Sequence, residues 1–211
     1  MAERGLRERK KADTRAALAA ATLRLAVDRG WEHVTVEAIT DAAGVSYRTF
    51  FNHFSAKEEA LLSPAGDDRV RLSARVRAQP AGAAVLDAVR AALRDEMAEL
   101  DADPGALRDR MTVVLGNPSL LPRLVEMGAT DERELALAVA ERTGQDVEAD
   151  LYPGLLAAVL SAAVRVSVWR WHVQDGATPL TALVDEALDA LAAGLLSSPS
   201  SPPASPPTGA P

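Results

Sequence analysis

Residues 35 to 54, TVEAITDAAGVSYRTFFNHF, restrict the fold of this chain more than any other stretch. Thr35 is of a residue type that caps helices, and apolar residues follow it at the spacing of one helix face, at Val36, Ile39 and Ala43. Gly44 ends this pattern, and Ser46 is placed to cap a second short helix that runs to about His53. Two short helices joined by a turn that contains glycine predict a helix-turn-helix unit.

The chain has three phenylalanines, and all of them lie in or directly after this second helix: Phe50, Phe51 and Phe54. Phe50 and Phe54 share a helix face with the preceding Val45, so we expect them to pack against the helices before them. The sequence therefore predicts that the phenylalanine cluster is structural. The other side of the helix carries groups that hydrogen-bond to anions and to base edges, namely Tyr47, Arg48 and Asn52.

Helix-forming residues continue over most of the chain. A first helix is predicted over residues 13–29, ahead of Gly30, and a short one over 57–62 that Pro64 is expected to end early. Breaks at Gly and Pro separate six further predicted helices, at 68–78, 83–101, 105–115, 118–142, 148–174 and 179–196. The sequence thus predicts an all-α protein. Its Ser/Pro-rich segment 197–211 cannot bury a core and is expected to be disordered.

The charge is distributed unevenly along the chain. The formal net charge of −7 disfavours a nucleic-acid partner, but residues 1–62 carry ten Lys and Arg against nine Asp and Glu, whereas the rest carries 13 against 21. The first fifteen residues alone hold six basic and three acidic side chains. Because local charge decides whether a surface can approach phosphate, the N-terminal part remains compatible with DNA.

Metal, cofactor and membrane roles have little support in the sequence. Cysteine is absent, and the three histidines are far apart, so we expect no metal site and no cofactor. The N-terminus is charged and lacks the apolar segment of a secretory signal. The longest uncharged apolar run, 151–164, is too short to span a bilayer, so a cytoplasmic protein without a membrane partner is expected.

The stretch GWEHVTVEAITDAAGVSYRTFFNHFSAKEEALL closely resembles the TetR/AcrR family of one-component transcriptional regulators, with a match that runs from Leu18 to Leu62. The resemblance implies an N-terminal three-helix helix-turn-helix DNA-binding domain over residues 1–62, with a basic arm at 1–15. A helical effector-binding and dimerisation domain would follow over 63–196. It further implies a repressor that binds a palindromic DNA operator as a homodimer and is released by a small molecule.

The same resemblance assigns roles to individual residues. It implies phosphate or backbone contacts for Thr35, Thr49, His53 and Lys57, and the recognition-helix cap for Ser46. The side chains that would face bases are Tyr47, Arg48 and Asn52. The chain departs from the family pattern at three positions, where it has Phe51 for the usual Tyr, Ala26 for a frequent Phe and Thr40 for the usual Ala. The first departure removes a phosphate-directed hydroxyl, which is worth about 1 kcal/mol as a net hydrogen bond.

The C-terminal half contains no diagnostic motif, and two interpretations stay open for each of its features. One apolar stripe consists of Leu180, Leu183, Val184, Ala187, Leu188, Leu191 and Leu195. It either builds the dimer interface with the preceding helix, or closes the core of the single chain. A ligand pocket or ordinary core would use Met97, Met111, Met127, Trp169 and Trp171. The cations that would meet an anionic ligand are Arg108, Arg110, Arg165 and His172.

The rival class of function is an all-helical enzyme, or a ligand-binding adaptor that retains the N-terminal domain as a structural cap. The sequence contains no Gly-x-Ser-x-Gly, phosphate-loop, His-Glu-x-x-His or paired-carboxylate motif. We therefore expect a regulator rather than an enzyme.

Overall fold

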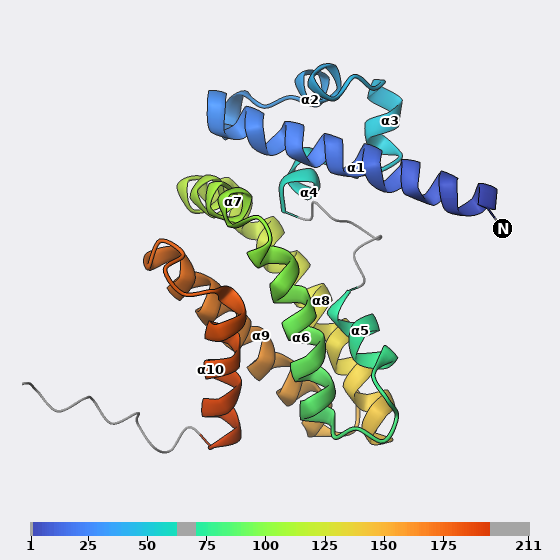
Figure 1. Cartoon of the computed structure of the whole chain (residues 1–211), viewed down its shortest axis with the longest axis vertical. Coiled ribbons are helices and arrows are strands. Elements are labelled where there is room, and N and C mark those ends of the chain that lie inside the picture. The colour runs from blue at the N-terminus through green and yellow to red at the C-terminus, as the bar shows by residue number, and fades with distance from the viewer. Residues whose placement is uncertain (1, 63–70, 195–211) are drawn as a thin grey trace, which may run out of the picture.

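The N-terminal helices form a layer that lies across one end of a bundle made by the rest of the chain, as the computed structural model shows (Figure 1). The structure describes residues 2–62 and 71–194, with side chains from residue 9 onward. Every regular element in these ranges is a helix, which confirms the predicted all-α class. The early helix end expected at Pro64 and the disordered tail expected over 197–211 lie outside the described residues.

The N-terminal layer contains α1 (Ala2–Arg29), the short 3₁₀ helix η1 (Trp31–His33), α2 (Val36–Ala43), α3 (Tyr47–Phe51) and α4 (Lys57–Leu62). Both predicted caps are formed: Thr35 Oγ1 accepts the N–H of Ala38 at 3.2 Å, and Ser46 Oγ accepts that of Thr49 at 3.1 Å. Gly44 joins α2 to the next turn with a φ of 67°, a left-handed conformation that glycine adopts without steric cost.

We call the buried core of this layer the N-terminal cluster; it includes Leu18, Leu25, Trp31, Ile39, Phe50, Phe54 and Leu61. Phe50 and Phe54 are at most 2% exposed, as the sequence predicts. Phe51 is 47% exposed, so the prediction that the whole phenylalanine cluster is structural is wrong for this residue. Successive helical residues point about 100° apart, which turns Phe51 away from the face that Phe50 buries.

The bundle contains α5 (Leu72–Ala78), α6 (Val85–Asp101), α7 (Pro104–Gly116), the 3₁₀ helix η3 (Pro118–Leu120), α8 (Leu121–Thr143), α9 (Leu151–Val173) and α10 (Leu180–Ala192). Its core, the C-terminal cluster, includes Val89, Leu93, Met97, Leu135, Val139, Leu160, Trp171, Leu180 and Leu183. Helix α7 belongs to both cores, because Leu107 packs in the C-terminal cluster and Val113 and Val114 pack in the N-terminal one.

Helix α1 begins at Ala2 rather than at the predicted residue 13, so the basic arm is part of the helix. Residues 2–12 are mostly Ala, Glu, Arg, Lys and Leu, which favour helix, with Gly5 as the one weak residue. Most of the other predicted boundaries lie within a few residues of the observed ones. Pro122 lies in the first turn of α8, where its missing N–H removes no helical hydrogen bond.

The apolar stripe of α10 faces the core of its own chain. Leu180, Leu183, Val184 and Leu188 are at most 6% exposed. The expectation that this stripe builds an interface with a second subunit therefore has to be corrected, because it closes the bundle of the single chain. Helix α9 instead carries exposed apolar residues, with fractions of 80% for Leu151, 53% for Leu155, 60% for Val166, 53% for Trp169 and 63% for Val173. A smaller exposed apolar group lies at the start of α8, at Leu121, Leu124 and Val125.

Helix α9 is also long and apolar enough to cross a membrane by length and composition, alone among the helices of the described residues. A single helix of this kind is weak evidence, since core helices of soluble proteins pass the same test. Arg165 interrupts its apolar sequence and is exposed.

Candidate nucleic-acid interface

The exposed face of α3 gathers four side chains with contrasting chemistry. Tyr47 and Phe51 are 52% and 47% exposed, with ring centroids 5.0 Å apart, and Arg48 and Asn52 are exposed beside them. Opposite this face, Phe50 is fully buried. The helix thus presents a guanidinium, an amide and two aromatic rings to the outside, while Phe50 holds its opposite side in the core.

The start of α3 is fixed by a pair of hydroxyl groups. Ser46 Oγ caps the helix and lies 2.8 Å from Thr49 Oγ1, so both hydroxyls hydrogen-bond locally. Thr35 is exposed at the start of α2, where its hydroxyl caps that helix. The three residues therefore shape the helix starts, which confirms Ser46 as the cap; the phosphate contacts of Thr35 and Thr49 stay predictions.

Arg15 ties α1 to α3 and α4 from inside the protein. Its side chain is 8% exposed, and its guanidinium carbon lies 3.9 Å from the centroid of the Phe54 ring. Nη1 donates to the carbonyl of His53 just after α3, and Nη2 lies 3.2 Å from Glu59 Oε1 in α4. Sequence analysis counted Arg15 with the basic arm, because nothing in its spacing distinguishes it from the solvent-exposed cations before it.

Glu59 completes this set of interactions from α4. Burial alone would raise the pKa of its carboxyl group, but hydrogen bonds from the backbone and hydroxyl of Ser55, together with Arg15, hold the pKa below its ordinary value of 4.5. The Ser55 N–H and Oγ lie 2.8 and 2.7 Å from Oε2. The ionised carboxylate therefore links α4 to the loop that follows α3.

The side chain of Lys57 makes several contacts within the protein. Its ammonium donates to the carbonyls of Val34 at 2.8 Å and Trp31 at 3.4 Å, and it lies 4.4 Å from the centroid of the Trp31 ring. These contacts join the start of α4 to the segment before α2. The sequence did not reveal this structural role, and the phosphate contact of Lys57 stays a prediction.

The two cores meet at α7. Arg110 Nε donates to the carbonyl of Leu61, the penultimate residue of α4, at 2.8 Å. A hollow of about 390 Å³ lies beside this junction, between the end of α1, η1 and α7, where Arg29, His33, Asp109 and Thr112 line it. Arg110 was a candidate for an anionic ligand, and the structure instead shows it contacting α4 of the N-terminal layer.

The residues proposed for a ligand pocket are not gathered at one place. Met97 is buried in the C-terminal cluster and Met111 packs against it, while Met127 and His172 are half-buried. Arg165 and Trp169 lie on the exposed side of α9, so they do not line the interior of this chain. The ring centroids of Trp169 and His172 are 6.4 Å apart. Ligand contacts of these six residues stay a prediction.

We predict that Glu59→Gln lowers the free energy of unfolding at neutral pH by about 1–3 kcal/mol, because hydrogen bonds to a charged group are lost. Since the pKa of Glu59 is lowered on folding, its stabilisation is present above 4.5 and is lost as the pH falls through the folded value. Urea unfolding at neutral pH and below 4.5 measures this difference. Glu58→Gln, its neighbour in α4, is the matched control, and the same pH dependence in both variants would contradict the assignment.

Comparison with known proteins identifies both halves of the chain. Residues 18–63 match the family model "Bacterial regulatory proteins, tetR family", and residues 83–196 match that of the "MftR C-terminal domain". The HTH-type transcriptional regulator TcmR of Streptomyces glaucescens is 35% identical over an alignment of 196 residues, and the match covers 89% of this chain and 86% of TcmR.

Solved structures share the fold. The repressor FadR of Thermus thermophilus, in complex with lauroyl-CoA, gives a TM-score of 0.57 at 22% identity, covering 90% of this chain and 100% of FadR. SmeT of Stenotrophomonas maltophilia, in complex with triclosan, gives 0.55 at 21% identity, covering 84% of this chain and 91% of SmeT. With the helix-turn-helix geometry of α2 and α3, the two family matches and the similarity to TcmR show that this chain belongs to the TetR family of transcriptional regulators.

Proposed function

We propose that this protein is a ligand-responsive repressor that binds a palindromic operator as a homodimer and dissociates when a small molecule binds. The observation that carries the proposal is the exposed face of α3, where Tyr47, Arg48 and Asn52 project from a helix anchored by the buried Phe50. In helix-turn-helix proteins the second helix lies in the major groove, and its side chains contact base edges. The enzyme alternative has no comparable constellation to support it.

Arg48 is the strongest candidate for direct reading of sequence. A guanidinium can donate two parallel hydrogen bonds to O6 and N7 of guanine, and Asn52 offers the amide that suits adenine. Thr35, Thr49, His53 and Lys57 surround this face as phosphate-contacting candidates. The Lys57 ammonium donates two hydrogen bonds, to the carbonyls of Val34 and Trp31. Because an ammonium has three donors, its third N–H remains for a phosphate.

The exposed face of α9 is the proposed dimer interface. Leu155, Val166, Trp169 and Val173 recur at helical spacing along a helix of 23 residues, which spans about 35 Å. The half-buried Ala158 and Ala162 lie between them and allow close approach of a second helix. Soluble monomers rarely expose continuous apolar patches of this extent, so a second copy is the occupant that we propose. Two-fold symmetry would then place the operator half-sites about 34–36 Å, or a multiple of it, apart.

The effector is proposed to act on the C-terminal cluster and to be sensed through α7. This helix packs Leu107 in the C-terminal cluster and Val113 in the N-terminal one, and its Arg110 holds the end of α4. A ligand that displaces α7 would therefore move contacts of both α1 and α4. Two of the solved structures that share this fold have been crystallised with small molecules, one with lauroyl-CoA and one with triclosan.

For the dimer, we predict that the double variant Val166→Glu/Trp169→Glu is a folded monomer with weakened operator binding, because two charges enter the apolar interface. Sedimentation at micromolar concentration measures the mass. Leu86→Glu, at a residue of α6 that is 46% exposed, is the matched control and should stay dimeric. Leu188→Glu should unfold instead of dissociating, since Leu188 is 6% exposed in the core. A monomeric unmodified protein would contradict the interface.

For the DNA, we predict that Arg48→Ala costs about 1–3 kcal/mol at the selected operator and relaxes preference at one base position per half-site. Lys57→Met should weaken all sequences alike and reduce the salt dependence by about one phosphate. Binding-site selection on both variants and the unmodified protein, at two salt concentrations, tests this assignment. Thermal unfolding of Lys57→Met separates lost DNA contacts from the lost contacts to Val34 and Trp31. If Lys57→Met alters the selected sequence and Arg48→Ala does not, the assignment is wrong, and Lys57 reads the sequence in place of Arg48.

A further inference from the structure

The first half of α1 extends beyond the packed body of the protein. Arg15 is the first buried residue of the helix, and none of residues 9–14 is buried. The distance along the helix axis from Ala2 to Arg15 is about 20 Å. Figure 1 shows this end of α1 passing under α3 and continuing past it, away from α10. Residues 9–14 therefore gain almost nothing from the core of their own chain.

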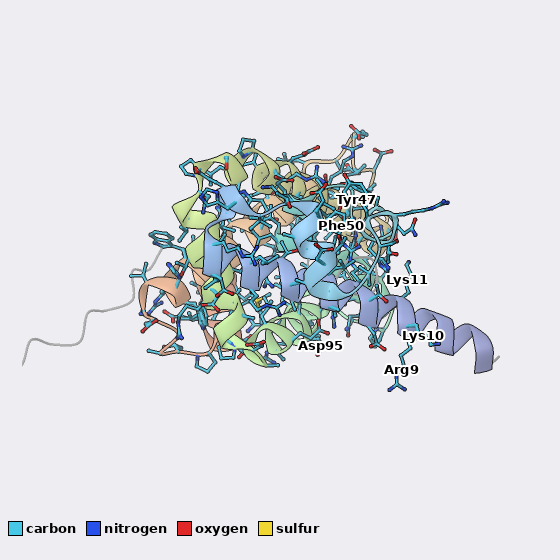
Figure 2. The ribbon with its side chains drawn as sticks, turned by 90° about the horizontal axis from the view of Figure 1, so that it is seen from above. Arg9, Lys10, Lys11, Tyr47, Phe50 and Asp95 are labelled. Atoms are coloured by element: carbon cyan, nitrogen blue, oxygen red, sulfur yellow. The ribbon has the colours of Figure 1, made fainter. Side chains whose placement is uncertain are left out.

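The extending segment is basic. Arg9, Lys10 and Lys11 are exposed at three successive positions, and Figure 2 shows them on the part of α1 that leaves the body. Successive side chains point about 100° apart, so the three cations cover more than half of the helix circumference. The sequence adds Arg4 and Arg7 to the same segment. A cationic helix with little packing is suited to a polyanion.

The direction of this segment is fixed relative to the recognition helix. Arg15 bonds to the carbonyl of His53, directly after α3, and to Glu59 of α4 while its guanidinium stacks on Phe54. Because α1 continues without a break on both sides of Arg15, the extension and α3 move as one body. When α3 lies in a major groove, the cations of the extension are therefore brought to the same DNA.

We propose that residues 2–14 of α1 form a second DNA-contacting element, in which Arg9, Lys10 and Lys11 bind phosphates outside the half-site that α3 reads. This inference rests on the proposed DNA-binding function. The N-terminal end of α1 and helix α10 lie on opposite sides of the molecule (Figure 1). Helix α9 packs against α10. In a dimer joined through the exposed face of α9, the two extensions therefore point away from each other, toward the flanks of the operator.

The test compares the unmodified protein with the triple variant Arg9→Ala/Lys10→Ala/Lys11→Ala on two fragments of a selected operator, one ending at the half-sites and one with flanks of about ten base pairs, a helical turn. On the long fragment the slope of log K against log salt should fall by about 0.9 for each phosphate contact that is lost. On the short fragment the two proteins should bind alike. Hydroxyl-radical footprints should lose protection in the flanks only.

The charge-matched control is Arg77→Gln/Arg94→Gln/Arg133→Gln, which removes three exposed arginines from the bundle. If the triple alanine variant and this control have the same salt slope on the long fragment, the proposal is wrong. Equal losses on both fragments contradict the flanking position. Circular dichroism shows whether the variant keeps its helix content. Failure of the unmodified protein to bind any selected DNA would instead contradict the proposed function itself.

A second inference comes from the exposed ring of Phe51. It lies edge-on to Phe50, with centroids 5.2 Å apart, and beside Tyr47, so its orientation is fixed although it is 47% exposed. The ring has no polar atom for a phosphate or a base edge. The major groove of DNA offers one apolar group, the C5 methyl of thymine. We infer that Phe51 reads a thymine by contact with this methyl group, and this too rests on the proposed function.

Replacing thymines of the selected operator with uracil, one at a time, removes only the methyl groups. At one position per half-site the unmodified protein should lose about fourfold in affinity, the value for burying one such group. Phe51→Ala should bind more weakly and show no further loss with uracil there. The inference is wrong if the unmodified protein tolerates uracil at every position, or if Phe51→Ala remains sensitive at the same one.

Discussion

The guanidinium of Arg15 is the interaction on which the geometry of the N-terminal layer depends. A cation that is 8% exposed loses most of its hydration, and it is stabilised here by the Glu59 carboxylate, the His53 carbonyl and the face of Phe54. Removing one of these partners would leave the buried guanidinium less well compensated and would destabilise the layer. The small cluster beneath it has only two buried phenylalanines and one tryptophan. Arg15 therefore adds directed contacts between α1, α3 and α4 to the apolar packing of this cluster.

The second constraint is the sharing of α7 between two cores. A helix whose two ends belong to different clusters cannot shift in one without disturbing the other, since packed interiors resist continuous deformation. Arg110 adds a directed hydrogen bond to the end of α4 at the same junction. The chain thus has a mechanical connection between bundle and DNA-binding layer within its described residues.

Local signals were sufficient for much of the fold. The caps at Thr35 and Ser46, the glycine turn and the burial of Phe50 and Phe54 each depend on neighbours within a few residues, so the sequence predicts them. The face of α9 and the stripe of α10 could not be told apart, because both helices are apolar over most of their surface and periodicity does not say which side meets the chain's own core. The partners of Arg15, Lys57 and Arg110 lie 23 to 49 residues away, beyond the reach of any local pattern.

These long-range contacts also reduce the number of cations in residues 1–62 that are available at the surface. Residues 1–62 hold ten cations, which is what made the N-terminal part compatible with DNA despite the acidic chain. Two of them, Arg15 and Lys57, bind protein groups in the structure and contribute less to an outer surface than the sequence suggests. Among the cations that remain exposed, Arg48 belongs to the face of α3, and Arg9, Lys10 and Lys11 belong to the extension of α1. A recognition helix with a single arginine supplies little attraction for a duplex that carries two charges per base pair, whereas affinity for DNA depends mainly on phosphate contacts. The extension therefore supplies, in three successive exposed cations, attraction for phosphate that α3 lacks.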